Sequence, residues 1–388
     1  MDIKMKELPT PFYVVDETLL ENNLNILKGV SDRTGAKILL AQKAFSMYRC
    51  YPLIGSFLSG ATASGLYEAR LGHEEMAVPM KMQGKACENH VYAPAFKEDE
   101  FTELLQYCDY TVFNSFAQVD KFAKTAKERG KSIGLRINPQ CSTQEGHAIY
   151  DPCAPGSRMG VTGDNFTQGI RERISLLDGL HFHTLCEQNS DDLEKTLDAV
   201  EEQFGSWLGK FKWINFGGGH HITREDYDIN RLEQCILRMQ DKYGLEVYLE
   251  PGEAVALYAG YLITSVLEIV NNGIEIAILD TSAACHMPDV LEMPYRPPLQ
   301  NSGRKGERAY SYRLAGPTCL AGDVIGDYSF DNPLREGDRL VFEDMAIYSM
   351  VKNNTFNGMP LPSIYLKKKD GSYEMVKQFD YEDFKGRL

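Results

Sequence analysis

The stretch Lys37-Ile38-Leu39-Leu40-Ala41-Gln42-Lys43-Ala44-Phe45-Ser46 sets the pattern on which the rest of the chain is built. Its short apolar run is typical of a buried strand, and Lys43 follows where that strand ends. Desolvation among apolar neighbours lowers the pKa of a lysine, and a neutral amine attacks carbonyls to form a Schiff base. A lysine at a strand end can also extend its ammonium group to the surface. The surroundings of Lys43 in the fold decide between these two interpretations.

An alternation of strands and helices begins at this stretch and continues to about residue 250. Helical periodicity is clearest over residues 17–29, 100–108, 116–129 and 191–204. The predicted strands are residues 37–40, 61–63, 90–93, 110–113, 132–137, 179–182, 212–216 and 246–249. Eight strands joined by helices predict an α/β protein with a closed (β/α)8 barrel of the TIM type over residues 17–260. A doubly wound sheet is the main alternative.

The pattern changes after residue 260 to strands that are separated by glycine and proline. Residues 261–270 form a long β-rich run, and Asn271-Asn272-Gly273 after it is a hairpin signal. Further strands are predicted at residues 275–279, 309–314, 338–342 and 363–367. We therefore expect a β-rich C-terminal domain of residues 261–388 that also takes residues 1–16, with strand 12–15 joining its sheet.

The composition excludes some classes of partner. Among 388 residues, 41 are Lys or Arg and 55 are Asp or Glu, which gives a net charge of −14. An acidic surface argues against nucleic acid and anionic membranes, and it is compatible with a cationic substrate. Nine cysteines without CxxC spacing indicate reduced thiols. With no signal peptide and no apolar run of membrane-spanning length, a soluble cytoplasmic protein is expected.

Chemically active side chains lie at the ends of three further predicted strands. Arg136 ends the fifth strand, His181 and His183 share one face of the sixth, and Glu250 ends the eighth. Each has a structural interpretation: an arginine paired with a carboxylate, a hydrogen-bonded histidine, a glutamate that caps a helix. Zinc is a further option for the two histidines, but no third ligand stands at a usable spacing, so no metal is expected.

The triple glycine Gly217-Gly218-Gly219 follows the seventh predicted strand. Glycines let backbone N–H groups approach an anion, and the start of a following helix favours negative charge. The turn does not fit the Walker or the Rossmann pattern. We interpret it as a phosphate cradle at the end of the barrel where such folds place their chemistry.

Together these strand ends fit pyridoxal 5'-phosphate. Lys43 would form the Schiff base, the glycines would bind the phosphate, and Glu250 would hold the pyridine nitrogen. His183 would cover the ring or act in proton transfer, and Arg136 is a further cofactor-binding candidate that could pair with an anionic oxygen. A protonated pyridine makes this cofactor an electron sink for a carbanion, and the loss of carbon dioxide from an amino acid requires such a sink.

Motifs beyond the barrel carry a family resemblance that runs from Pro9 to about Pro362. They are Gly316-Pro317-Thr318-Cys319-Leu320-Ala321-Gly322-Asp323, Ala346-Ile347-Tyr348 and Thr355-Phe356-Asn357-Gly358. With them the chain resembles the fold-type III, alanine racemase-like pyridoxal phosphate decarboxylases, which include ornithine and diaminopimelate decarboxylases. The resemblance implies a homodimer with its active sites at the subunit interface. It also implies that Cys319 enters the partner's site to help protonate the carbanion, and that Tyr348 contacts the cofactor phosphate.

Two barrel motifs resemble one branch of this family, the carboxynorspermidine (carboxyspermidine) decarboxylases. They are His183-Thr184-Leu185-Cys186-Glu187 and Glu250-Pro251-Gly252-Glu253-Ala254. Relatives usually have arginine where Glu253 stands, and they often have an acid where Leu320 stands. Carboxylates bind ammonium groups through charge-assisted hydrogen bonds. We therefore expect Glu253 and Asp289 to bind the distal amines of a polyamine substrate, with Glu187 and Asp280 as lesser candidates.

The resemblance implies decarboxylation of carboxynorspermidine or carboxyspermidine to norspermidine or spermidine, a step of polyamine biosynthesis. The alternative within the family is decarboxylation of diaminopimelate or a basic amino acid. A different class of function is a non-catalytic protein that binds the cofactor, or a decarboxylase-like regulator. The second domain and the joint presence of Lys43, Glu250 and Cys319 argue against that class.

Overall fold

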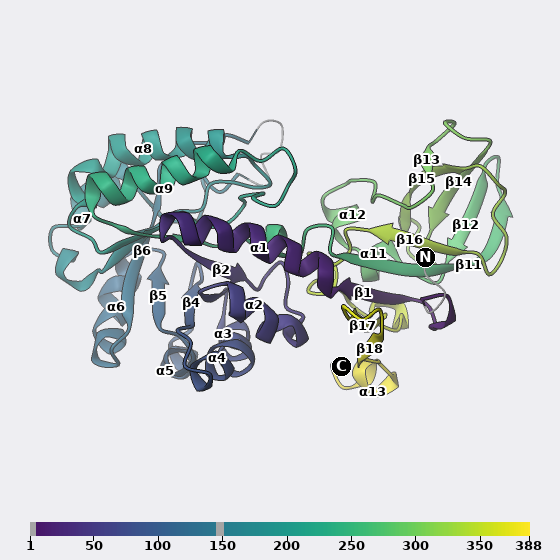
Figure 1. Ribbon diagram of the computed structural model, residues 1–388, viewed down its shortest axis with the longest axis horizontal. Coiled ribbons are helices and arrows are strands. Elements are labelled where there is room, and N and C mark those ends of the chain that lie inside the picture. Colours follow the sequence, from purple (N-terminus) through teal and green to yellow (C-terminus); the bar gives the residue numbers. More distant parts are fainter. Residues whose placement is uncertain (1–4, 145–150) are drawn as a thin grey trace. The chain divides into compact units, whose positions relative to one another are not determined.

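The computed structural model describes residues 5–144 and 151–388, and the chain divides into two compact units. One unit comprises Glu21–Val255, and the other comprises Met1–Leu20 together with Ala256–Leu388. Figure 1 shows the strands and helices of each. Across the described ranges, none of the helices combines the length and hydrophobicity that a membrane span requires.

The first unit is a closed barrel. Within the described residues its eight parallel strands run in the order β5-β4-β3-β2-β10-β9-β8-β6, and pairing between β5 and β6 closes the ring. The strands are β2 (Lys37–Ala41), β3 (Gly60–Ala63), β4 (Glu88–Tyr92), β5 (Tyr110–Phe113), β6 (Ser132–Asn138), β8 (Gly179–His181), β9 (Trp213–Asn215) and β10 (Glu246–Leu249). A short strand, β7 (Val161–Thr162), adds to β6. The predicted barrel is confirmed, and because the ring closes, the doubly wound alternative is wrong.

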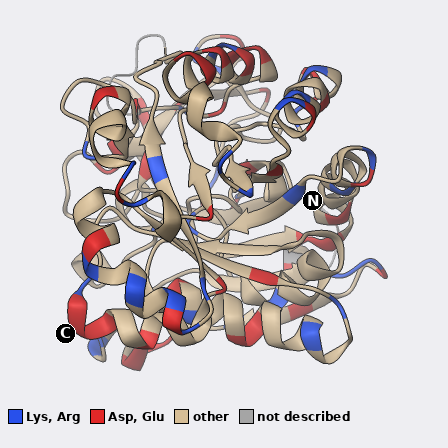
Figure 2. Ribbon diagram, turned by 90° about the vertical axis from the view of Figure 1, so that its left-hand side faces the viewer, with Lys and Arg blue, Asp and Glu red and all other residues tan. Residues whose placement is uncertain are grey.

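Helices connect these strands and pack an apolar stripe against them. They are α1 (Glu17–Thr34), α2 (Tyr51–Phe57), α3 (Leu66–Gly72), α4 (Val78–Met82), α5 (Glu98–Tyr107), α6 (Phe116–Glu128), α7 (Gly163–Gly169), α8 (Ser190–Leu208), α9 (Ile229–Tyr243) and α10 (Glu253–Ala256). In α8, for example, Leu193, Leu197, Val200 and Phe204 are buried at helical spacing. Figure 2 shows acidic and basic residues interspersed along the helices.

Trp213 is a central member of the side-chain cluster that fills the barrel interior below the candidate site. Trp213 on β9 lies level with Gly179 on β8, which lies level with Gly134 on β6. A Cβ atom on Gly134 or Gly179 would lie 2.4 Å or 2.0 Å from the Trp213 ring, so only glycine leaves room for the indole. The indole also contacts Tyr110 on β5, which is not a neighbour of β9, so the contact crosses the interior. The next inward-facing residues along these strands form the site.

The second unit is built on a mixed sheet. Its strands are β1 (Phe12–Asp16), β11 (Gly260–Asn271), β12 (Glu275–Leu279), β13 (Gly303–Arg304), β14 (Tyr310–Ala315), β15 (Val324–Phe330), β16 (Arg339–Glu343), β17 (Ser363–Lys367) and β18 (Tyr373–Lys377). As predicted, β1 joins this sheet, antiparallel to β11 and parallel to β17. The hairpin at Gly273 is also confirmed, since β11 and β12 pair antiparallel across it. Short helices α11 (Ala283–His286), α12 (Asp289–Glu292) and α13 (Tyr381–Lys385) complete the unit.

Candidate functional site

Strand register places three polar side chains side by side at the C-terminal end of the barrel. Arg136 on β6 lies level with His181 on β8, and His181 lies level with Asn215 on β9. All three are buried. They form the layer directly above Trp213, because side chains two residues further along a strand point to the same face.

The carboxylate of Glu250 is the centre of this layer. Its Oε1 accepts a hydrogen bond of 2.8 Å from Asn215 Nδ2, and its Oε2 lies 3.2 Å from His181 Nε2. Burial alone would raise the pKa of Glu250, but the interactions with His181 and Asn215 lower it to about 2. The carboxylate is therefore ionised at neutral pH.

His183 lies just beyond β8 and is fixed in one tautomer. Its Nδ1 accepts a hydrogen bond of 2.7 Å from the N–H of Gly218, so the ring proton must sit on Nε2. Burial, together with the charges of Lys43 and Arg136, holds the pKa of His183 well below its usual value. Arg136 donates to the His183 carbonyl at 3.1 Å, and its guanidinium lies 4.6 Å from the centre of the Tyr92 ring. The sequence thus supplies a neutral imidazole with a fixed orientation.

The triple glycine turn fits only glycine. Gly217 and Gly219 have φ values of 70° and 82°, and a Cβ on Gly219 would lie 2.0 Å from the carbonyl oxygen of Leu185. Asn215 Oδ1 accepts from the N–H of Gly217 at 2.8 Å, and Gly218 binds His183. Among the described residues the N–H groups of Gly219 and His220 have no acceptor. The predicted phosphate cradle therefore has two backbone donors. They are the N–H groups of the last glycine and of His220 after it.

Lys43 lies two residues beyond β2. Burial among protein atoms, reinforced by the charge of Arg136, lowers the pKa of Lys43, and the acids Glu250 and Glu253 oppose this shift only in part. Although protein atoms surround it, the side chain keeps solvent-exposed surface, so a small molecule can reach it. The electrostatic influence of Arg136, Glu250 and Glu253 places all three near the amine. The structure thus favours a role for Lys43 as a nucleophile over one in which it only extends its ammonium group to the surface.

Glu253 begins α10 and has a partner that the sequence analysis missed. Its Oε2 lies 3.0 Å from Nε2 of His221, which is buried, while its other oxygen has no hydrogen-bond partner among the described residues. The acid Glu187 lies in the loop after β8 with a positive φ of 55° and is exposed. Cys186 beside it is partly exposed, and burial raises the pKa of its thiol to about 12.

The remaining predicted site residues belong to the β-rich unit. Cys319 is exposed, and its N–H donates to Asn357 Oδ1 at 2.8 Å. Asp289 and Tyr348 line the same small hollow, and the Asp289 carboxylate forms an ion pair with Lys352. Asp280 accepts hydrogen bonds of 2.6 Å from both Thr10 and Thr264. Asp280 therefore links the segment before β1 to β11 within the β-rich unit.

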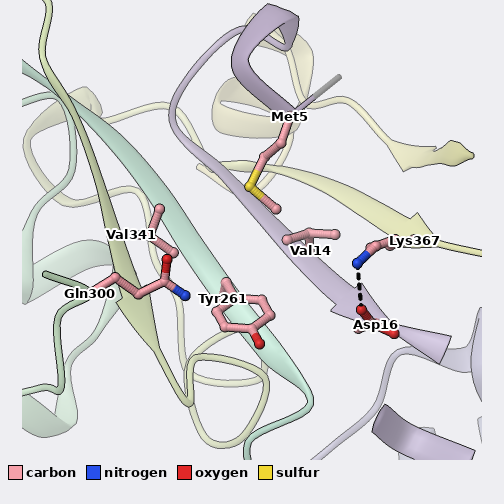
Figure 3. A pocket seen from close by; sticks show the side chains of 7 residues that line it. All are labelled: Met5, Val14, Asp16, Tyr261, Gln300, Val341 and Lys367. Carbon is pink, nitrogen blue, oxygen red and sulfur yellow. Dashed lines mark hydrogen bonds and ion pairs between the residues drawn. The ribbon is translucent and has the colours of Figure 1, made fainter. Parts of the chain in front are cut away.

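Another cavity, of about 190 Å³, opens on the sheet of the β-rich unit. Figure 3 shows it between β1 and β11, with the ion pair of Lys367 and Asp16 at one side, 2.9 Å long. The described residues that line it are Met5, Val14, Asp16, Tyr261, Gln300, Val341 and Lys367. None of the predicted site residues is among them.

The residues present fit pyridoxal phosphate. A reachable amine with a lowered pKa, an ionised carboxylate, a neutral imidazole and two backbone donors in a glycine turn lie at the ends of neighbouring strands. The sequence predicted Lys43, Glu250 and His183, which the structure places at neighbouring strand ends, but it did not indicate the contacts that Asn215, His181 and His221 make with the two acids. Period-two alternation from Trp213 would have placed Asn215 on the same inward face of the strand, one layer above the indole.

Comparison with known proteins agrees with this chemistry. The sequence profile of the family described as "Pyridoxal-dependent decarboxylase, C-terminal sheet domain" matches residues 12–346. A carboxynorspermidine/carboxyspermidine decarboxylase from Campylobacter jejuni is 42% identical, over 98% of each chain. A carboxyaminopropylagmatine decarboxylase from Synechocystis is 38% identical, over 99% of this chain and 97% of the relative.

A solved structure resembles the whole chain. It is carboxynorspermidine decarboxylase from Campylobacter jejuni in complex with norspermidine. It matches with a TM-score of 0.90 and 40% identity, over 98% of this chain and all of that one. The resemblance predicted from the sequence is therefore confirmed.

The two lysines at either end of β2 should respond oppositely to removal of their charge. We expect Lys43→Met to raise the melting temperature of the cofactor-free protein at neutral pH, because a group with a lowered pKa binds protons more readily in the unfolded chain. The same linkage makes stability rise with pH as the unfolded lysine approaches its own pKa. Calorimetry on both proteins checks this.

The matched control is Lys37→Met. Lys37 Nζ lies 2.6 Å from Glu88 and 2.9 Å from Glu246. Although burial opposes it, these acids raise the pKa of Lys37. Its loss should cost up to about 1 kcal/mol, because two partly exposed carboxylates lose their ion-pair partner. A fall in melting temperature for both variants would contradict our account of Lys43.

Proposed function

The chain belongs to the pyridoxal-dependent decarboxylases, and from this premise we propose that it decarboxylates carboxynorspermidine, carboxyspermidine or both. The products would be norspermidine or spermidine and carbon dioxide, as part of polyamine biosynthesis. The similarity to the Campylobacter jejuni enzyme over nearly the full length of both chains carries this proposal. The structural neighbour that holds norspermidine supports it.

We assign the barrel residues as follows. Pyridoxal phosphate, when bound, supplies an electron sink for the pair of electrons left behind by carbon dioxide. Lys43 provides the neutral amine that holds the cofactor aldehyde. Glu250 holds the pyridine nitrogen, and the neutral ring of His183 packs against the ring face. The N–H groups of Gly219 and His220, in the turn that Gly217 and Gly218 shape, bind the phosphate.

The remaining assignments follow from contacts in the barrel and from the family resemblance. Arg136 orients the His183 segment, because its guanidinium donates a hydrogen bond to the backbone carbonyl of His183. Tyr348 adds a contact to the cofactor phosphate. The nine free cysteines suit a reducing compartment, and we propose that the protein works in the cytoplasm.

A second candidate substrate is carboxyaminopropylagmatine, because the Synechocystis relative also covers nearly the full chain. It differs from the polyamine substrates by a guanidinium group at one end. A planar guanidinium and a compact ammonium make different hydrogen bonds with a carboxylate. The two candidates are therefore separable by measurement.

Product analysis on four substrates tests the proposed reaction. We expect kcat/KM for carboxynorspermidine or carboxyspermidine to exceed that for diaminopimelate by more than about tenfold, because diaminopimelate carries a second carboxylate toward Glu253. If kcat/KM is highest for carboxyaminopropylagmatine, the second candidate substrate is established. Protein without a visible absorption band that borohydride bleaches would contradict every enzymatic assignment, and Lys43→Ala serves as the negative control.

We propose that Glu253 binds a distal ammonium group of the substrate, with Asp289 as a second acid. Glu253 has one oxygen held by His221 and the other available, whereas Asp289 would have to exchange its pair with Lys352. Glu187 lies in the neighbouring loop and ranks below both. Asp280 ranks last, because its carboxylate already binds Thr10 and Thr264.

Glu253→Gln should raise KM by about tenfold or more with a smaller change in kcat, since a hydrogen bond to a charged group contributes about 1.5–3 kcal/mol. Asp289→Asn, measured under the same conditions, should have the smaller effect. Steady-state kinetics with the preferred polyamine substrate give both numbers. An unchanged KM in both variants would show that other groups bind the distal amines.

We propose that the protein acts as a homodimer in which Cys319 serves the site of the partner subunit. Cys319 and Leu320 are exposed in the β-rich unit, and Phe356, in another motif of the same unit, is half exposed. Equal mixing of Lys43→Ala and Cys319→Ala subunits should restore about one quarter of the native sites, because half of the dimers gain one intact site. If the mixture is no more active than its two components, the site lies within one chain.

A further inference from the structure

His181 is the most deeply placed titratable group of the barrel site, and the assignments above give it no role. It is 2% exposed, and its ring stacks on that of Tyr92 with the centroids 5.5 Å apart. Tyr92 lies on β4, which is not a neighbour of β8, so this contact spans the interior. Its Nε2 faces Glu250 Oε2 at 3.2 Å.

The proton positions around Glu250 follow from this geometry. Asn215 donates from Nδ2 to Oε1, and because an ionised carboxylate can only accept, His181 carries its proton on Nε2 and donates to Oε2. Within the described residues, Nδ1 of His181 is buried without a hydrogen-bond partner. An imidazolium would leave a buried N–H donor without an acceptor there, whereas a neutral imidazole leaves only a lone pair. Burial, although opposed by Glu250, also lowers the pKa of His181.

The other charged groups near His181 and Glu250 also favour a neutral imidazole. The positive charges of Arg136 and Lys43 disfavour a further positive charge on His181 and so lower its pKa further. His90 on β4 is itself bound to Glu88, with His90 Nε2 3.2 Å from Glu88 Oε2. The pair is thus a neutral imidazole that donates to a carboxylate.

We propose that His181 is a positioning residue that keeps Glu250 ionised and turned toward the pyridine nitrogen of the cofactor. Two donors from neighbouring strands hold one lone pair on each oxygen of the carboxylate. The remaining lone pairs can accept a pyridinium proton, which a protonated carboxyl could not do equally well. This inference rests on the proposed role of Glu250 and not on which amine is the substrate.

Removal of the His181 donor has a definite chemical consequence. Glu250 would keep only the neutral donor Asn215 inside a buried site, so its carboxyl would hold a proton up to higher pH. The one proton shared by the two groups would then reside on the carboxyl oxygen, which donates to the pyridine nitrogen, and no longer on that nitrogen. A merely structural histidine, needed only for its stack on Tyr92, would not change the protonation of the cofactor.

The test uses pyridoxal phosphate labelled with ¹⁵N in the ring, bound to the full-length protein without substrate. We expect a ¹⁵N chemical shift of a protonated pyridine in the unaltered protein and in His181→Gln, which keeps an N–H donor. In His181→Leu the shift should move toward that of an unprotonated nitrogen at the same pH. The dissociation constant for pyridoxal phosphate should rise by about tenfold, the factor that one pKa unit represents.

Two results would overturn the inference. An unchanged ¹⁵N shift in His181→Leu with the cofactor bound would show that Glu250 stays ionised alone. An unprotonated nitrogen in the unaltered protein would overturn the role of Glu250 as well. If His181→Leu does not fold, His181→Asn replaces it, because its shorter amide cannot reach Oε2, and the same shift is expected.

Discussion

The ionised carboxylate of Glu250 at the centre of the barrel is the constraint that the site depends on. A buried charge is costly unless it is paired and hydrogen-bonded. Here two strands that neighbour each other, β8 and β9, each supply one donor to one oxygen. The backbone joins the same network, since the N–H of Glu250 donates to the Gly217 carbonyl at 2.8 Å. A shift in strand register would break all these contacts together.

Glycines make this arrangement possible at two levels of the barrel. Gly134 and Gly179 leave the space that Trp213 fills, and the indole forms the floor of the site. Above it, Gly217 and Gly219 bring the turn against the backbone of the preceding loop, where a Cβ would collide. Close packing therefore fixes the turn that carries the free N–H groups, and no flexible segment is needed to form it.

The fold could be predicted from the sequence because each barrel strand is a short apolar run between helices of clear periodicity. Prediction failed where a strand is polar or interrupted: β15 contains Gly326 and Asp327, and β18 alternates weakly. Lys43 and Glu250 were found because strand ends alone place them at one face. The partners Asn215 and His221 depend on register and on the path of loops, which one-dimensional patterns do not contain.

The charge balance of the site is compatible with an acid at Glu253. An unpaired carboxylate beside a phosphate cradle would oppose anion binding, yet His221 holds one oxygen of Glu253 at 3.0 Å. The other oxygen is left to attract a cation. The backbone N–H groups to which we assign the phosphate carry no net charge and do not repel an ammonium group. A site built in this way can hold an anionic cofactor and a polycationic substrate within a few side chains of each other.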